Sequence, residues 1–257
     1  MTFLDDLMAS TRARIELLKQ RVTPEALEQR LAAAEEPRGF RGSLDGDAVA
    51  IIAEIKRATP ARGDLNRELN ASAIASDYAR GGASAISVLT EPDYFRGSLE
   101  DLYGARSARL PVLRKDFILD EMQVLESRAE GADAVLLIVR ILGDELGRLL
   151  TASRALGMDA LVEVYDESDL ARALEAGAAL IGVNHRDLET FEVDPERTAK
   201  LAPQVPEGTT VVALSGVSTR AEVNELAAAG AHAVLVGESL VTASDPAAKL
   251  RELLGRP

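Results

Sequence analysis

Charged side chains stand at the ends of short apolar runs, where the sequence pattern predicts buried strands. Glu54 and Lys56 end the run AVAIIAEIK, Lys115 ends LPVLRK, and Glu163 lies inside LVEVY. Lysine can shift its pKa, transfer a proton or form an imine, unlike arginine. Only five of the 29 basic residues are lysines, and two of the five occupy these positions. Two amines and two carboxylates at one place would suit general acid–base catalysis; structural ion pairs with Glu54 or Glu163 are the alternative.

Glu163 is the most informative of these residues. Its neighbours Val162 and Val164 share one face of a strand, so Glu163 points to the opposite face. An unpaired carboxylate is costly to bury. A nearby lysine or a raised pKa would relieve that cost, and both suit acid–base chemistry.

A repeated pattern identifies the elements that must position these groups. Four segments join a helical stretch to an apolar run through Gly-Ala: RGGASAISVL, EGADAVLLIV, EAGAALIGVN and AAGAHAVLVG. Their glycines, Gly82, Gly131, Gly177 and Gly230, suit the left-handed residue that ends a helix. The intervals between them are long enough for a β-α-β-α unit each, so the pattern predicts eight βα units.

Four further apolar runs lie halfway along these intervals, at 48–55, 110–115, 158–164 and 209–215. The eight strands are then expected to end near residues 55, 89, 115, 139, 164, 184, 215 and 237. Continuous apolar runs are typical of parallel strands covered on both faces. Eight such units favour a (β/α)8 TIM barrel. An open doubly wound sheet is the alternative, but neither GxGxxG nor GxxxxGK[ST] occurs.

We expect a single domain over 1–257, in which residues 1–47 form an N-terminal helical extension and 48–257 form the barrel. The extension is predicted to contain helices at about 2–20 and 23–35. A later helix is expected over 220–230, with Thr219 as its N-cap.

Composition excludes several classes of function. The net charge is −13 and no basic stripe is present, so we expect no nucleic-acid or membrane partner. The chain has no cysteine and two histidines, which excludes thiolate and histidine-rich metal sites. The N-terminal segment lacks the basic start and apolar stretch of a signal peptide, so we expect a cytoplasmic protein. We also expect a monomer.

In such a barrel, chemistry takes place at the carboxyl ends of the strands. Small or polar residues occur at several of these ends: Ser87, Asn184, Ser215, Gly216, Gly237 and Glu238. Loops after the last two strands often bind phosphate, and small residues there expose backbone N–H groups. We therefore expect an anion site at 215–216 and 237–238, with two tight turns as the alternative. Phe95 and Phe117 either line an apolar part of a substrate or cover the rim.

Seven motifs together carry a family resemblance. IIAEIKRATPARG, ISVLTEPDYFRGSLEDL, LPVLRKDFILDEMQV, GADAVLLIV, LVEVYDESDL, IGVNHRDLETFEVD and VLVGESLV resemble the successive motifs of indole-3-glycerol phosphate synthase, from about residue 3 to 254. The resemblance implies a (β/α)8 barrel with an N-terminal helical extension. It implies a tryptophan-biosynthesis lyase without metal or organic cofactor, whose phosphorylated substrate is 1-(2-carboxyphenylamino)-1-deoxyribulose 5-phosphate. The products are indole-3-glycerol phosphate, CO2 and water.

The resemblance also implies roles for individual residues. Lys115 would be the general acid that protonates the ribulose carbonyl oxygen, and Glu163 the carboxylate that assists later proton transfers and dehydration. Glu54 and Lys56 would orient the substrate and the catalytic groups. Asn184, counted among the catalytic residues, and Arg186 would bind the polar groups of the substrate. The other substrate-binding residues would be Ser87 and Thr59, which carry hydroxyl groups; Phe95, Phe117 and Leu136, which would contact the anthranilate ring; and Ser215, Gly216, Gly237 and Glu238, which would bind the phosphate.

One position departs from the family pattern. Leu214 precedes Ser215-Gly216 where the family has a glutamate. Leucine cannot accept a proton, so either turnover is reduced, or Glu54 and Glu163 suffice, or the chain is a diverged variant. Two other functions therefore stay open. One is a Schiff-base aldolase of a sugar phosphate using Lys56 or Lys115; the other is a barrel that binds the ligand but has impaired catalysis.

Overall fold

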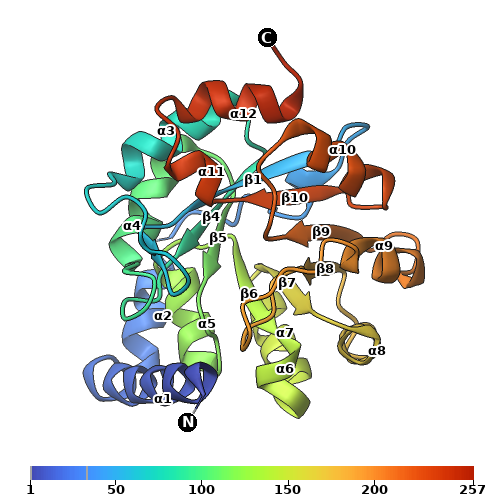
Figure 1. Ribbon diagram of the computed structural model, residues 1–257. Helices are drawn as coiled ribbons and strands as arrows, with labels where there is room; N and C mark the ends of the chain where they lie inside the picture. Colours follow the sequence, from blue (N-terminus) through green and yellow to red (C-terminus); the bar gives the residue numbers. More distant parts are fainter. Residues whose placement is uncertain (1, 33) are drawn as a thin grey trace.

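The computed structural model describes residues 2–32 and 34–257, and within them eight parallel strands close into a barrel (Figure 1). The barrel strands, in chain order, are β1 (Ala50–Ile55), β4 (Ala85–Leu89), β5 (Val112–Lys115), β6 (Ala134–Ile138), β7 (Asp159–Val164), β8 (Leu180–Asn184), β9 (Thr210–Leu214) and β10 (Ala233–Val236). Strand β10 pairs with β1, which completes the ring. This closure confirms the predicted (β/α)8 barrel and excludes the open sheet.

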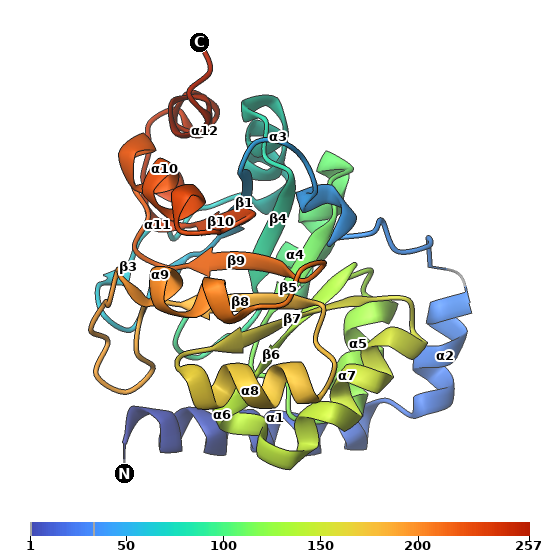
Figure 2. The same ribbon diagram turned by 90° about the vertical axis from the view of Figure 1, so that its right-hand side faces the viewer.

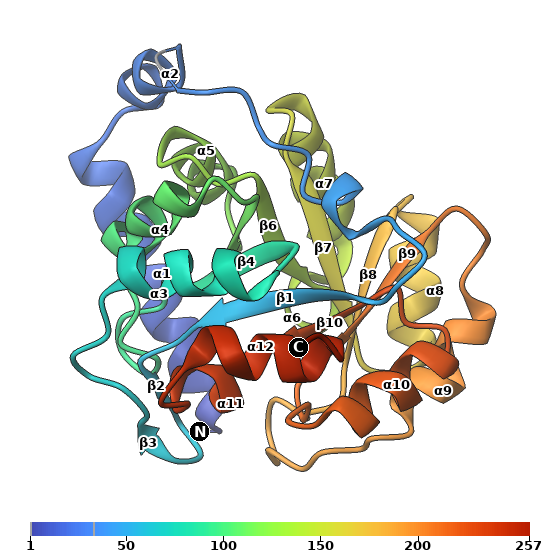
Figure 3. The ribbon, with the colours of Figure 1, turned by 90° about the horizontal axis from the view of Figure 1, so that it is seen from above.

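Helices surround the strands, as the view from above shows (Figure 3). The α-helices are α1 (Phe3–Arg21), α2 (Pro24–Ala32), α3 (Ala71–Gly81), α4 (Leu99–Ala105), α5 (Glu121–Ala129), α6 (Val139–Leu142), α7 (Leu146–Ala155), α8 (Glu167–Glu175), α9 (Arg197–Leu201), α10 (Arg220–Ala228), α11 (Glu238–Val241) and α12 (Pro246–Leu254). Short 3-10 turns lie at η1 (Gly42–Leu44), η2 (Arg106–Ala108), η3 (Gly143–Glu145) and η4 (Ala202–Gln204). Within the described ranges, no helix is both long and apolar enough to cross a membrane.

The four Gly-Ala junctions end helices as predicted. Gly82, Gly131, Gly177 and Gly230 all have positive φ, between 79° and 99°. Helix α10 begins after Thr219, whose side chain accepts a hydrogen bond from the backbone N–H of Glu222 in a capping box. The loop after β1 contains an element that the sequence pattern did not predict. There, β2 (Ala58–Thr59) and β3 (Gly63–Asp64) form a two-stranded antiparallel sheet.

Side chains alternate between two apolar cores. One core, with Ile51 and Val88, lies between the strands and the surrounding helices. The other fills the barrel interior with Ile52, Leu113 and Leu161. Alternation along a strand places every second residue inside. Glu54, two residues after Ile52, therefore belongs to the interior face, as does Glu163, two residues after Leu161.

The N-terminal extension contacts both ends of the interior core. Helices α1 and α2 lie outside the ring of strands (Figure 2), and Leu7 of α1 packs onto the interior cluster. At the other end, Phe40 enters the same cluster and is fully buried. The Asp159 carboxylate accepts the backbone N–H of Arg41 at 2.8 Å, which fixes this segment at the start of β7. The extension thus contributes to the barrel's own core.

Replacement of Phe40 by alanine tests this contribution. We expect Phe40→Ala to lower the free energy of unfolding by about 3–5 kcal/mol, because a large buried ring is lost and its cavity refills only partly. Urea denaturation measures the change. Tyr103→Ala, which removes a ring that is 70% exposed, is the control and should change stability by less than about 0.5 kcal/mol. A loss below about 1 kcal/mol for Phe40→Ala would show that this end of the barrel is closed without the ring.

Candidate active site

A cavity of about 320 Å³ opens at the carboxyl ends of the barrel strands. Most of the residues predicted from the sequence line it: Glu54, Lys56, Thr59, Phe95, Lys115, Phe117, Asn184, Arg186, Ser215, Gly216, Gly237 and Glu238. The strands deliver these side chains because parallel strands end at one rim of the barrel. The sequence-based reasoning did not identify several other lining residues, among them Phe3, Arg62 and Phe191.

The cavity contains a carboxylate between two lysines. Lys56 Nζ lies 2.8 Å from Glu54 Oε1, and Lys115 Nζ lies 3.7 Å from Glu54 Oε2. Burial acts to raise the pKa of Glu54, but the positive charges of Lys56 and Lys115 outweigh it, so the pKa is below its ordinary value. Glu54 is 2% exposed and stays ionised at neutral pH. It therefore holds two ammonium groups at the cavity wall.

Gly237 makes room for this ion pair. A Cβ atom at position 237 would overlap Glu54 Oε1 and lie 3.2 Å from Lys56 Nζ. The backbone after β10 can pass the ion pair closely only because glycine has no side chain. The sequence pattern attributed this glycine to a phosphate turn; the structure adds a contact with the charged groups of β1.

Three predicted residues are absent from the cavity lining. Glu163, Ser87 and Leu136 are buried and lie in the barrel interior, where they are at most 3% exposed. Among the described side chains neither lysine pairs with Glu163; Tyr165, just after β7, donates its hydroxyl hydrogen bond to Glu163 Oε1 instead. A nearby lysine, one of the two means expected to relieve the cost of burying Glu163, is thus replaced by a phenol. The roles predicted for these three residues stay predictions.

Asn184 connects the ends of three strands. Its Oδ1 accepts hydrogen bonds from Ser215 Oγ at 2.9 Å and from the backbone N–H of Arg186 at 3.1 Å. Its Nδ2 donates to the Tyr165 hydroxyl at 3.1 Å. The amide therefore joins residues that follow β7, β8 and β9, and hydrogen bonds at both its oxygen and its nitrogen fix its orientation.

The turn after β9 has an unusual backbone. Ser215 has φ 71° and Gly216 has φ 83°. A non-glycine residue with positive φ is strained, and such strain concentrates at functional sites. His185 stabilises the turn, with Nδ1 3.2 Å from the Ser215 carbonyl oxygen and Nε2 2.7 Å from Thr198 Oγ1. Burial lowers the pKa of His185, so its ring is neutral at pH 7.

Two turns of small residues form one side of the cavity, at 215–218 and 237–239. For the N–H groups of Gly216 and Val217, no acceptor is recorded among residues 2–32 and 34–257. The Glu238 carboxylate pairs with Arg62 in the turn between β2 and β3. The second turn can therefore offer its backbone rather than this side chain to an anion.

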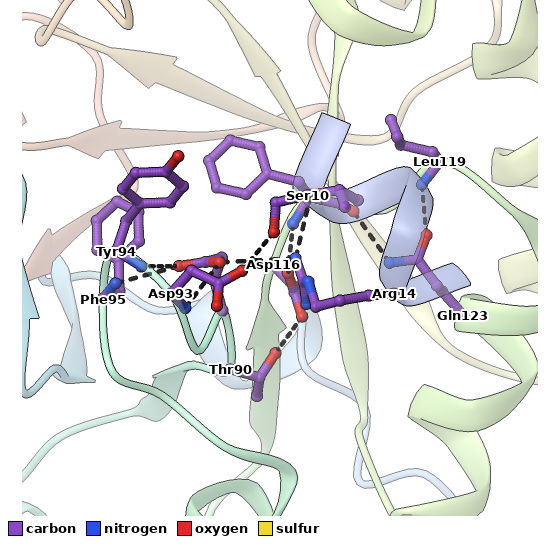
Figure 4. Close-up of polar contacts among 12 residues, drawn as sticks. Ser10, Arg14, Thr90, Asp93, Tyr94, Phe95, Asp116, Leu119 and Gln123 are labelled. Atoms are coloured by element: carbon purple, nitrogen blue, oxygen red, sulfur yellow. Dashed lines mark hydrogen bonds and ion pairs between the residues drawn. The ribbon is translucent and has the colours of Figure 1, made fainter. Parts of the chain in front are cut away.

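The residue after Lys115 anchors helix α1 to the rim (Figure 4). Asp116 accepts hydrogen bonds from Thr90 at 2.7 Å, Arg114 at 3.1 Å and Arg14 of α1 at 3.3 Å. Burial acts to raise the pKa of Asp116, but Arg114 and Arg14 outweigh it and lower the pKa. An ionised, fully bonded Asp116 fixes the backbone that carries Lys115.

Helix α1 also supports the aromatic edge of the cavity. The Glu91 carboxylate accepts the backbone N–H groups of Tyr94 at 2.7 Å and Phe95 at 3.1 Å. The ring centroid of Phe3 lies 4.9 Å from that of Tyr94 and 5.2 Å from that of Phe191. Phe3 therefore bridges two loops that follow different strands. The helical pattern of the extension carried no signal for this contact, because packing partners are tertiary.

The electrostatics of Glu54 predict a pH effect on stability. The pKa of Glu54 is lower in the folded chain than in the unfolded chain, so its contribution is present at neutral pH and is lost as pH falls through the folded value. We expect stability to fall more steeply with acidification, below about pH 4.5, in the wild type than in Glu54→Gln. The difference in slope is at most about 1.4 kcal/mol per pH unit. Urea titrations at a series of pH values measure it.

Glu175→Gln is the control for this experiment, because Glu175 is exposed on α8. That variant should follow the wild-type curve. Equal slopes for wild type and Glu54→Gln would show that the lysines do not stabilise the ionised carboxylate.

Comparisons with known proteins point to one family. A family model described as indole-3-glycerol phosphate synthase matches residues 4–253. The chain is 48% identical over 248 residues to the indole-3-glycerol phosphate synthase of Parafrankia sp. (strain EAN1pec), covering 96% of this chain and 92% of that protein. It is 44% identical over 265 residues to the protein of the same name from Roseiflexus sp. (strain RS-1), covering 99% and 98%.

A solved structure supports the fold alone. Thiamine phosphate pyrophosphorylase from Pyrococcus furiosus superposes with a TM-score of 0.60 at 18% identity, covering 83% of this chain and 95% of that one. The family match and the two relatives span nearly the whole sequence, including every strand end that lines the cavity. The chain therefore belongs to the indole-3-glycerol phosphate synthase family.

Proposed function

We propose that the cavity converts 1-(2-carboxyphenylamino)-1-deoxyribulose 5-phosphate into indole-3-glycerol phosphate, CO2 and water. The observation that carries this proposal is the pair of lysines held by Glu54 in the same cavity as two turns of small residues. A phosphorylated keto sugar needs both an acid for its carbonyl oxygen and an anion site at its other end. The cavity contains candidates for both.

The lining suggests how the substrate lies. Its phosphate fits the turns at 215–218 and 237–239, where Gly216 and Val217 have free N–H groups among the described residues. Its anthranilate ring fits against Phe95 and Phe117, whose centroids are 6.4 Å apart. Arg186, also in the lining, carries the positive charge suited to the anthranilate carboxylate. This orientation places the ribulose carbonyl between the two ends, near the lysines.

Ring closure requires an acid at the carbonyl oxygen. As the aromatic carbon that bears the carboxylate attacks the carbonyl carbon, a carbon–carbon bond forms and the oxygen takes a proton from Lys115. Cleavage of the carbon–carboxylate bond then releases CO2 and restores the aromatic ring. In the last step the new hydroxyl group takes up a second proton and leaves as water, while the neighbouring carbon, which is bonded to the nitrogen, loses a proton so that the double bond of the indole forms. A fixed ammonium group stabilises the charge that develops on oxygen. Glu54 and Lys56 fix the electrostatic environment and the orientation of the Lys115 side chain.

We also propose that the chain works as a cytoplasmic monomer. Its large exposed apolar side chains, in the part of the chain that the structure describes, are Leu17, Tyr103 and Val193, on three separate elements. Scattered single residues are ordinary on a monomer's surface. A biosynthetic lyase acting on a phosphorylated metabolite fits that compartment.

The first test of this function is turnover. Incubation with the carboxyphenylamino deoxyribulose phosphate is expected to produce indole fluorescence without added metal. Lys115→Ala should lower kcat by about 10²–10⁴-fold, the usual contribution of a positioned acid, while calorimetry still detects substrate binding. A folded wild-type protein without product after hours would overturn the proposal, and a borohydride-trapped adduct with a keto-sugar phosphate would support a Schiff-base aldolase.

Leu214 permits a second test. It is buried on the cavity wall, and its Cδ1 lies close to Gly182 of β8. We expect Leu214→Glu to raise kcat by about tenfold or more, because the variant supplies a carboxylate that can exchange protons beside the lysines. Leu214→Gln has the same size without the charge and should not reproduce the gain. An unchanged or lower rate in Leu214→Glu would show that the missing carboxylate does not limit turnover.

A further inference from the structure

Tyr165 is a buried phenol that contacts two of the proposed catalytic residues. It directly follows β7 and is 2% exposed. Its hydroxyl donates a hydrogen bond to Glu163 Oε1 and accepts one from Asn184 Nδ2 at 3.1 Å. The sequence pattern gave Tyr165 no role, because an aromatic residue after a buried strand usually belongs to the core.

Glu163 depends on this hydroxyl. Its other carboxylate oxygen, Oε2, is buried and has no hydrogen-bond partner among the described residues. Within the same ranges no ion pair to Glu163 is found either. A buried carboxylate with a single donor has one interaction that fixes its orientation. Removal of that donor leaves both oxygens without a partner.

The Tyr165 ring is itself held by two arginines. The guanidinium carbon of Arg140 lies 4.4 Å from the ring centroid and that of Arg197 lies 5.7 Å away. Arg140 pairs with Asp166 at 2.9 Å and with Asp169 at 3.2 Å. These cation–π contacts restrict the ring. The phenol therefore has little freedom to leave its two hydrogen bonds.

The phenol stays a hydrogen-bond donor at working pH. Burial and the negative charge of Glu163 raise the pKa of Tyr165 well above its ordinary value. The hydroxyl is thus protonated at neutral pH, and it also accepts the hydrogen bond of the Asn184 amide. Asn184 continues to Ser215 at 2.9 Å, next to the small-residue turn.

We propose that Tyr165 is a positioning residue of the ring-closing reaction, holding Glu163 and Asn184 in one hydrogen-bonded row that ends at Ser215. The inference rests on the proposed function, because it takes Glu163 and Asn184 as groups that act on the substrate. Asn184 lines the cavity whereas Glu163 does not. The row therefore fixes the buried carboxylate relative to a residue that the substrate can contact.

Tyr165→Phe removes only the hydroxyl group and leaves the ring beside its two arginines. We expect kcat to fall by about tenfold or more, with KM changed by less than about twofold, because substrate contacts are retained. Because Tyr165 acts partly through Glu163, the fold loss of kcat in the double variant Tyr165→Phe/Glu163→Gln should be smaller than the product of the two single losses, and any loss beyond that of Glu163→Gln reports the contact with Asn184. Steady-state kinetics of the four proteins measure this cycle.

Tyr78→Phe is the matched control. Tyr78 is also a buried phenol with a hydrogen bond, at 3.0 Å to the backbone carbonyl oxygen of Glu54. Thermal unfolding should show similar losses of stability in the two phenylalanine variants. In the double variant Tyr78→Phe/Glu163→Gln, by contrast, the fold loss of kcat should equal the product of the two single losses. A kcat for Tyr165→Phe within about twofold of wild type, or multiplicative losses in its cycle, would overturn the proposal.

A measurement that does not depend on turnover tests this inference separately from the proposed function. In protein labelled with 13C at glutamate carboxyl groups, comparison with Glu163→Gln identifies the Glu163 resonance. Tyr165→Phe removes the only recorded donor to this carboxylate among the described residues, so the resonance should move from its wild-type position, whereas in Tyr78→Phe it should stay. An unmoved resonance refutes the row even if the wild type is active; a moved resonance in an inactive wild type supports the row and rejects the reaction.

Discussion

The site depends on one buried carboxylate between two ammonium groups. Glu54 is taken out of water, and a buried charge of this kind persists only when opposite charges compensate for the lost hydration. Lys56 and Lys115 provide that compensation from adjacent parts of the rim. Because like charges repel, Glu54 offsets the repulsion between the two ammonium groups at the cavity wall. The same interaction requires glycine at position 237, so the constraint extends to the loop after the last barrel strand.

The N-terminal extension also supports the cavity. Arg14 of α1 pairs with Asp116, the residue after Lys115, and Phe3 packs on two loops that border the cavity. At the opposite end of the barrel, Phe40 fills the interior core. A change in α1 therefore reaches the rim of the cavity through side-chain contacts rather than along the backbone. In this family member, the extension acts as a second layer of support for the ends of β4 and β5.

Much of the site was predictable because barrel topology brings all strand ends to one rim. Once eight strands were assigned, Glu54, Lys115, Asn184 and the turn at Ser215 had to lie together. The partner of Glu163 was not predictable in the same way. A lysine was expected from charge alone, whereas Tyr165 satisfies the carboxylate through a neutral hydrogen bond. Charge pattern carries no information about a hydroxyl that approaches from two residues further along the chain.

The sequence by itself determined the number and order of the barrel strands, the glycine caps and the family, because these follow from local periodicity, backbone conformation and the order of motifs. Tertiary structure decided which side chains face the cavity and which stay beneath it. Glu163 lies in the interior although it has the same strand-end position as residues in the lining. Such differences arise from strand stagger and from the packing of side chains on different elements, such as Phe3 and Arg14 of α1. No pattern along a single segment encodes them, since each contact joins residues far apart in the chain.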